Sequence, residues 1–486
     1  MMKKRVGIIL LVGIILVGVL GLSGCNKAET GSKLTTLTWY LPGVDMGNLS
    51  LVEEEINKKL NSEYNINLDI VLIDAGNYAN KMQIINASKE EYDLCFTSNW
   101  MNDFYQGATT GALADITELV PKYAPKLYGL MSSDIWNAIR IDGKLYSVPN
   151  WQIQAQGLAL SIPQGKLDKV NMSIDELNTF EDVTKYLENL SKVETNTDQF
   201  NSDWIQNATY YGIAMLGETS IPGAIYFKGD NATKVINQYE TPEFREYVKL
   251  MRSWVENGYI SGVHETETYN KAAKSGIERE PLRITVYSPK LERILENTGY
   301  DWSVRQFSPA VMSTAGIAAA MTGVSATSKY PEVAVRMLEI VNSDKEIFNL
   351  ICYGVEGKHF EKVDENHIKR LENASYTGVS DFYIGNTALG YLLEGTDDNV
   401  NDVTREINDT AILLPTMGFY VDTTNILTEI SNCKTVINEQ LDVLERGIVP
   451  ADEGVDKLCA DLKKAGADKI VAEYQRQLDE WMAKNK

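Results

Sequence analysis

The sequence predicts an α/β protein with helical additions at its carboxyl end. Three observations support this fold class. Strand-like and helix-like segments alternate between residues 34 and 97, an Asp-Gly turn divides two extended runs near residue 142, and residues 443–486 are helical in pattern. Alternation of this kind is typical of a parallel sheet with helices on its faces.

The first 25 residues read as an export signal. Lys3, Lys4 and Arg5 precede an apolar run over residues 6–22, and Leu-Ser-Gly then leads into Cys25. A basic head, an apolar core and small residues are the mark of a secretory leader. Leu-Ser-Gly-Cys resembles the bacterial lipobox, which implies a diacylated, palmitate-type anchor on Cys25. We expect residues 1–24 to be the signal peptide and 25–32 a flexible tether; an uncleaved membrane anchor is the alternative.

Length and charge limit the number of domains and the kinds of partner expected for the rest of the chain. Residues 25–486 are enough for two to three domains with large cores. The net charge of −21 argues against binding to nucleic acid, which needs a basic surface. The four further cysteines are widely spaced and form no Cys-x-x-Cys pair, so we expect them to act mainly as small core residues: Cys95, Cys352, Cys433 and Cys459.

The amino-terminal elements follow from periodicity. Residues 34–41, 66–72 and 92–97 are apolar or alternating and read as strands. Between them, residues 51–60 and 78–87 repeat apolar side chains at helical spacing. The β-α-β-α-β order predicts a parallel sheet.

The middle of the chain carries the clearest local signals. Asp142-Gly143 supplies the positive φ values of a tight turn, and we expect a hairpin over residues 141–149. Thr179 with Asp182 three residues later predicts a capped helix start. Further elements are expected as strands at 154–161 and 282–287, helices at 242–257 and 331–341, and a helical tail from 443 that Gly466 interrupts.

Several stretches together resemble the extracellular, family 1 solute-binding proteins of carbohydrate ABC importers. The resemblance rests on the hairpin at 142–149, the strand region 93–97 with 107–116, the segment 323–334, and residues 353–360 and 418–481, which are similar to a Firmicute lipoprotein subgroup with a carboxyl-terminal domain of unknown function. It implies a two-lobed, type II periplasmic-binding-protein-like fold that closes on a ligand about a hinge near residues 148–151. It also implies a first lobe of residues 33–150 with 303–350 and a second of 151–302 with 351–486.

Candidate ligand contacts are aromatic and polar residues near strand ends, where open α/β sheets bind ligands. Aromatic rings cover the apolar faces of sugars, and amides or carboxylates satisfy their hydroxyl groups. Each of these side chains could equally belong to the core or to an ordinary surface. The candidates are Trp39, Tyr40, Asn99, Trp100, Trp151, Gln154, Tyr287 and Glu356, with Trp151 favoured as the ring on which a sugar stacks.

Enzyme signatures are sparse. The sequence has no His-Glu-x-x-His, Gly-x-Ser-x-Gly or phosphate-loop pattern, and the acidic run 397–402 lacks the glycine and final glutamate of a calcium loop. We therefore expect no catalysis, cofactor or metal, and a monomer anchored at the outer face of the cytoplasmic membrane that delivers a sugar or oligosaccharide to a permease. The alternatives are a surface glycoside hydrolase and a peptide-binding or adhesin lipoprotein.

Overall fold

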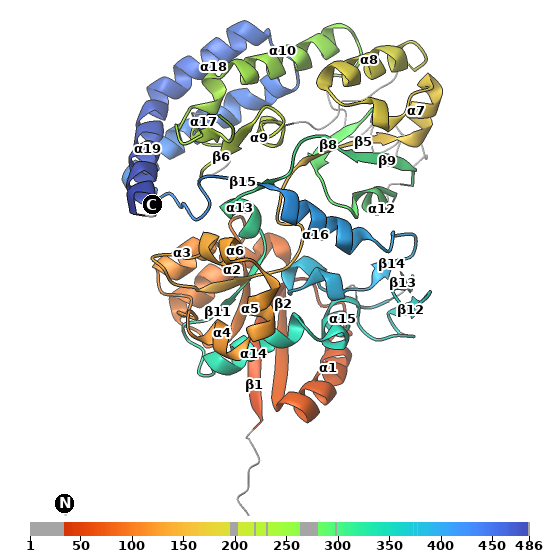
Figure 1. Ribbon diagram of the computed structural model, residues 1–486, viewed down its shortest axis with the longest axis vertical. Coiled ribbons are helices and arrows are strands. Elements are labelled where there is room, and N and C mark those ends of the chain that lie inside the picture. Colours follow the sequence, from red (N-terminus) through yellow and green to blue (C-terminus); the bar gives the residue numbers. More distant parts are fainter. Residues whose placement is uncertain are drawn as a thin grey trace, which may run out of the picture.

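The computed structural model describes residues 34–194, 203–217, 220–229, 232–262, 280–296, 299–372, 374–376 and 378–484. They form two lobes stacked along the long axis, with the strand β1 in one lobe and the carboxyl terminus on the other (Figure 1). Each lobe has its own buried apolar core. The predicted signal peptide, Cys25 and the tether lie outside the described residues.

The first lobe is built on a five-stranded sheet of order β2-β1-β3-β11-β4. The predicted β-α-β-α-β start is confirmed, because the first three strands are parallel and the last two return antiparallel to their neighbours. The elements are β1 (Thr35–Pro42), α1 (Leu49–Tyr64), β2 (Ile66–Ile73), α2 (Ala75–Ser88), β3 (Leu94–Thr97), β4 (Ser147–Pro149) and β11 (Met321–Val324).

Helices cover this sheet with amphipathic faces. In α2, Tyr78, Met82 and Ile85 are buried at helical spacing and leave the opposite face in solvent. The predicted tight turn is present, with φ of 51° at Asp142 and 79° at Gly143. The further helices of this lobe are α3 (Phe104–Thr109), α4 (Leu119–Tyr123), α5 (Pro125–Leu130), α6 (Ser133–Ala138), α14 (Pro331–Val341) and α15 (Lys345–Tyr353).

The second lobe centres on a three-stranded sheet of order β8-β5-β9. The predicted cap is present, since the Thr179 hydroxyl accepts the Asp182 N–H and the Asp182 carboxylate accepts the Thr179 N–H. The strands are β5 (Leu158–Pro163), β6 (Ile213–Met215), β7 (Ala224–Tyr226), β8 (Arg283–Val286) and β9 (Trp302–Gln306); the helices are α7 (Gln164–Val170), α8 (Phe180–Ser191), α9 (Trp204–Asn207), α10 (Pro242–Glu256) and α12 (Leu291–Glu296).

Three carboxyl-terminal helices complete the second core. They are α17 (Leu427–Glu445), α18 (Ala451–Ala465) and α19 (Ala467–Lys484), and α17 and α18 pack on α10. Gly466 separates α18 from α19 with a φ of 109°, a conformation that glycine adopts without steric cost. The helical tail is confirmed, although it consists of separate helices and α17 begins 16 residues before the predicted start.

Within the described residues, three chain crossings join the lobes. The first runs from β4 to β5, the second includes β10 (Val311–Met312) and α13 (Thr314–Ile317), and the third follows α16 (Val400–Thr410) through β15 (Ile412–Leu413). Gln156 and Val311 exchange backbone hydrogen bonds of 2.9 Å, and β10 pairs with β15. The crossings are therefore held side by side between the lobes.

The structure corrects the predicted lobe boundaries in two places. β9 pairs with β5, so residues 302–306 belong to the second lobe. Residues 351–407, predicted in the second lobe, instead pack on the first core through Ile351, Phe360, Ile368 and Ile384. This segment includes β12 (Phe360–Lys362), β13 (His367–Arg370) and β14 (Leu392–Leu393). Its apolar residues would suit the core of either lobe, so the sequence alone could not assign the segment to one of them.

Among the described residues, no helix combines the length and apolar character needed to cross a bilayer. The same residues contain no group of three or more His, Cys, Asp or Glu side chains arranged to hold a metal ion. Cys95, Cys352, Cys433 and Cys459 are free thiols, and burial raises the pKa of Cys95 to about 12.

Candidate functional site

The loop after β3 places two predicted side chains, Asn99 and Trp100, at the face of the first lobe that meets the hinge. Asn99 Nδ2 donates to the Ala315 carbonyl at 3.2 Å, and Trp100 Nε1 donates to the Ala319 carbonyl at 2.7 Å. Both acceptors belong to α13 or directly follow it. The loop is thereby fastened to the second chain crossing.

Trp100 presents an exposed but fixed aromatic ring. Its side chain is 55% exposed, and Phe96 packs edge-on against it with ring centroids 6.2 Å apart. The indole N–H is already bound to a carbonyl, so the ring has little freedom to rotate. A large apolar surface held this way in solvent is suited to stacking on a ligand.

An aromatic row continues from Trp100 across the first lobe. Phe96 lies 4.6 Å from Tyr383, and Tyr383 lies 4.1 Å from Phe382, measured between ring centroids. The Phe382 carbonyl accepts a hydrogen bond of 2.7 Å from Asn150 Nδ2 at the first crossing. Sequence reasoning missed Phe382 and Tyr383; their side-by-side occurrence after Asp381 in a loop was the signal.

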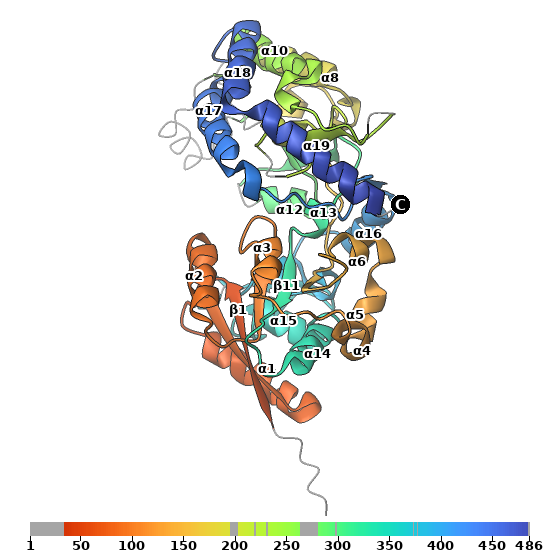
Figure 2. The same cartoon turned by 90° about the vertical axis from the view of Figure 1, so that its left-hand side faces the viewer.

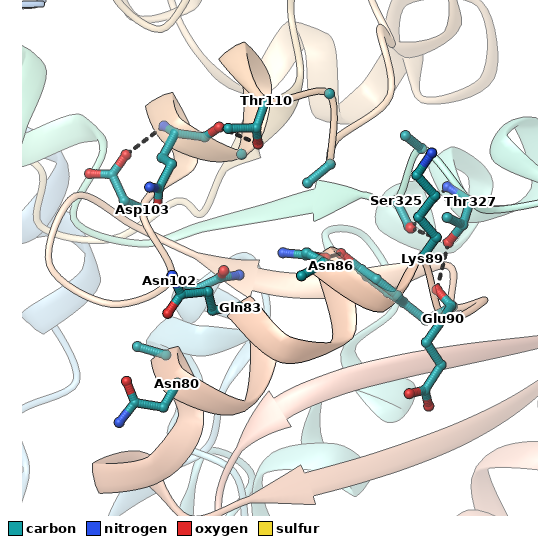
Figure 3. Close-up of a pocket in the computed structure, with 18 of the residues that line it drawn as sticks. Asn80, Gln83, Asn86, Lys89, Glu90, Asn102, Asp103, Thr110, Ser325 and Thr327 are labelled. Carbon is teal, nitrogen blue, oxygen red and sulfur yellow. Dashed lines mark hydrogen bonds between the residues drawn. The ribbon is translucent and has the colours of Figure 1, made fainter. Parts of the chain in front are cut away.

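A groove of about 770 Å³ opens beside Trp100. Its lining comes from one face of α2 and the residues after it, from the loop before α3 and one face of α3, and from residues 325–327 after β11 (Figure 3). Figure 2 shows α2 and α3 on one flank of the first lobe, below α12 and α13. Its volume falls within the ~300–1,000 Å³ of small-ligand sites.

Two smaller hollows lie where the second lobe meets the chain crossings or the first lobe. One of about 150 Å³ is lined by Gly157 of the first crossing, Thr209 after α9, and Ser313 and Ala315 of the second crossing. The other, of about 520 Å³, lies between α12 and residues 378–396. Lys290 and Asp381 face each other across it with a 3.0 Å ion pair, so one side chain from each lobe closes this edge.

Of the remaining predicted site residues, Tyr287 lies at this junction with a partly exposed side chain. It directly follows β8, is half-buried, and packs against the apolar core of the first lobe as well as a small cluster in the second. Burial raises the pKa of its phenol. Tyr287 therefore stays protonated at neutral pH and can donate a hydrogen bond.

The structure places the other predicted residues elsewhere. Trp39 is fully buried and Tyr40 is 8% exposed, with its hydroxyl donating to Glu90 at 3.1 Å. Trp151, the favoured ring, is 7% exposed because residues 351–411 return over it, and Arg405 lies 5.8 Å from its ring centroid. Gln154 is 1% exposed, and Glu356 pairs with Lys362 on the surface at 3.1 Å.

The electrostatics of the groove favour a neutral ligand. Its charged side chains are Lys89, Glu90 and Asp103, and Asp103 Oδ1 accepts the Gln106 N–H at 2.7 Å to cap α3. Burial raises the pKa of Asp103, although hydrogen bonds from the backbone N–H groups of Gln106 and Tyr105 act in the opposite direction. Asp103 and Glu90 stand at opposite ends of the groove (Figure 3), which is not the paired arrangement used for glycoside hydrolysis.

Known proteins resemble this chain over nearly its whole length. A family model described as "Domain of unknown function (DUF3502)" matches residues 415–483. A Streptococcus pneumoniae protein named carbohydrate ABC transporter substrate-binding protein is 27% identical over 478 residues, covering 96% of this chain and 94% of that protein. These matches confirm the resemblance to carbohydrate importers' binding proteins, including the carboxyl-terminal domain.

Solved structures confirm the two-lobed fold. The N-glycan transport solute binding protein NgtS of S. pneumoniae has a TM-score of 0.80 and 24% identity, covering 93% of this chain and all of that one. An extracellular solute-binding protein of Bifidobacterium longum subsp. infantis has a TM-score of 0.61 and 15% identity, covering 93% and 99%. These relatives are described as binding proteins and not as enzymes.

Proposed function

We propose that this protein captures a sugar or oligosaccharide between its two lobes and delivers it to an ABC importer. The observation that carries the proposal is Trp100, a ring that is exposed, fixed by its indole N–H, and flanked by the amides of Asn99 and Asn102. Aromatic faces cover the C–H surfaces of sugars, and amides both donate to and accept from hydroxyls. The 27% identical relative carries the corresponding name.

Lobe movement fits the same proposal. The TM-score against NgtS falls from 0.80 to 0.70 for its complex with Man1GlcNAc and to 0.67 for its complex with Man5GlcNAc. All three are structures of the same protein, so the change in TM-score reflects a change in its conformation. Such a change is expected of two lobes that alter their relative orientation. In the present chain, the paired crossings at Gln156, β10 and β15 would serve as the hinge.

Thermal unfolding of residues 25–486 against a panel of oligosaccharides tests the function, with product analysis of each mixture. A ligand present at about 100 times its Kd should stabilise the fold by roughly 2.7 kcal/mol and remain chemically intact. Shortened sugars would indicate a hydrolase. Unchanged melting with every sugar, including Man1GlcNAc and Man5GlcNAc, would contradict the proposal.

The predicted signal peptide and lipidated cysteine indicate where in the cell the protein would act. With Cys25 diacylated, the folded lobes would sit as a monomer at the outer face of the cytoplasmic membrane, within reach of permease subunits. We expect fatty-acid analogue label on the wild-type protein in cells and none on Cys25→Ala. Equal label on both proteins would rule out this anchor.

A further inference from the structure

We infer that the groove between α2 and α3 holds part of the same sugar chain, so that the natural ligand is an oligosaccharide that extends or branches out of the inter-lobe cleft. This inference rests on the proposed function and adds a second binding region to it. It comes from the position, the lining and the length of the groove.

A hydrogen bond joins the lining of the groove to the lining of a hollow at the boundary between the lobes. Asn99 lines the groove and donates to the carbonyl of Ala315, and Ala315 lines the 150 Å³ hollow against the second lobe. Trp100 stands at the same end. A sugar chain stacked on Trp100 can therefore have one end between the lobes and another in the groove.

The groove also extends well away from the hinge. It begins at Asn99, beyond the carboxyl end of β3, and reaches Glu90 and Tyr92, which precede the amino end of that strand. The four residues of β3 alone account for roughly 13 Å at the usual rise of a strand. A site confined to the cleft between the lobes does not need this length.

The lining selects a neutral, hydroxyl-rich ligand. One face of α2 supplies Asn80, Gln83 and Asn86 (Figure 3). α3 supplies Gln106. Within the part of the chain that the structure describes, the side-chain amides of Asn80, Gln83 and Gln106 form no hydrogen bond, and these three residues are exposed. Each such amide can donate to one hydroxyl and accept from another.

A peptide fits the groove less well than a sugar. Apart from Trp100, the lining offers no large exposed apolar side chain to anchor one. β3 and β11, whose ends border the groove, are paired on both sides within the sheet, so no free strand edge is available for strand addition. The mixed charges of Lys89, Glu90 and Asp103 give no basis for binding an anionic partner.

Two neighbouring residues of α2 allow a matched test. Gln83 lines the groove, whereas Ile84 is 64% exposed and does not. Gln83→Trp fills the groove, and Ile84→Trp adds the same bulk to the same helix outside it. A second variant, Gln83→Ala with Gln106→Ala, removes two unpaired amides without adding bulk.

The readout is calorimetric affinity for Man5GlcNAc and for the shorter Man1GlcNAc, with melting temperature as a check on folding. We expect Gln83→Trp to weaken Man5GlcNAc about tenfold or more and the double alanine variant to weaken it about fivefold or more, with Man1GlcNAc unchanged in both. Ile84→Trp should match the wild type for both sugars.

Unchanged Man5GlcNAc affinity in Gln83→Trp would overturn the inference. Equal losses for both sugars would also overturn it, because the groove would then belong to the primary site. Failure of the wild-type chain to bind either sugar would count against the proposed function as well.

Discussion

At the scale of single residues, solvent exposure distinguishes Trp100 from Trp151, the ring that sequence reasoning had favoured as the sugar platform. Trp100 and Trp151 both follow strands of the first-lobe sheet, and both have amide neighbours. In the structure Trp100 is 55% exposed, whereas Trp151 is only 7% exposed. The difference arises from α16, which is distant in sequence and packs Arg405 over Trp151. No local pattern around residue 151 carries that information.

A buried carboxyl gives a prediction about pH. Glu445 ends α17, and burial, aided by Asp203 and Asp442, raises its pKa to about 8 while its Oε1 accepts the Trp204 N–H at 2.6 Å. The folded state therefore holds a proton that the unfolded chain releases near pH 4.5. Stability should fall as pH rises from about 4.5 to about 8.

Glu445→Gln keeps an acceptor for the Trp204 N–H and cannot ionise. We expect it to match the wild type in free energy of unfolding at pH 4.5 and to exceed it by on the order of 1–3 kcal/mol at pH 8. Urea denaturation at both pH values measures this. Parallel pH profiles for the two proteins would show that Glu445 does not titrate in this range.

At the scale of elements, local signals predicted most helices and strands correctly. The Asp142-Gly143 turn, the Thr179 cap, the Pro242 helix start and the Gly466 break are all present where their chemistry placed them. Strand β5 begins at Leu158, four residues later than predicted, because residues 150–157 form the first crossing. Backbone groups at a hinge are paired by distant segments, and their sequence carries no strand period.

One side chain of α16 forms hydrogen bonds with the backbone of the first crossing. Asn408 Oδ1 accepts the N–H groups of Gln154 and Ala155 at 2.9 and 3.0 Å, and its Nδ2 donates to the Gln152 carbonyl at 2.7 Å. Both Gln154 and Ala155 are buried. Removing the amide leaves two buried donors without their acceptor.

Asn408→Ala should therefore lower the free energy of unfolding by about 1–3 kcal/mol and speed hydrogen exchange at Gln154 and Ala155. Asn401→Ala, on the same helix, is the control, since its amide reaches the Ala388 carbonyl only at 3.5 Å. If the Gln154 and Ala155 amides exchange at the same rates in Asn408→Ala as in Asn401→Ala, Asn408 does not stabilise the first crossing.

At the scale of the whole molecule, sequence predicted the class of fold and protein but not the lobe that each late segment joins. Residues 351–407 return to the first lobe and bring Tyr383 against Phe96 from 287 positions away in the chain. The candidate site depends on such contacts between segments. A local pattern could therefore mark Phe382 and Tyr383 as a pair of aromatic residues in a loop, but it could not place them beside Phe96.

The Lys290–Asp381 ion pair couples the two lobes in the arrangement seen here. Both side chains are about one-quarter exposed, and they lie 3.0 Å apart. A pair of this exposure contributes about 0.2–1 kcal/mol. It can therefore shift the balance between lobe arrangements by up to about fivefold.

Because both residues act through one contact, Lys290→Met, Asp381→Asn and the double variant should change oligosaccharide affinity in the same direction and by similar factors of up to about fivefold. Lys329→Met with Glu91→Gln removes an ion pair within the first lobe and should leave affinity unchanged. Additive effects of the two single substitutions would mean that they act separately from this contact.

The most direct test of the central claim is a calorimetric titration of Trp100→Ala and Trp100→Phe with the oligosaccharide that most stabilises the wild type. Loss of the exposed ring should weaken binding about tenfold or more, since burying a large apolar side chain is worth roughly 1.5–3 kcal/mol. Trp100→Phe should recover part of that affinity, and both variants should melt near the wild-type temperature. Wild-type affinity in a folded Trp100→Ala protein would contradict the account.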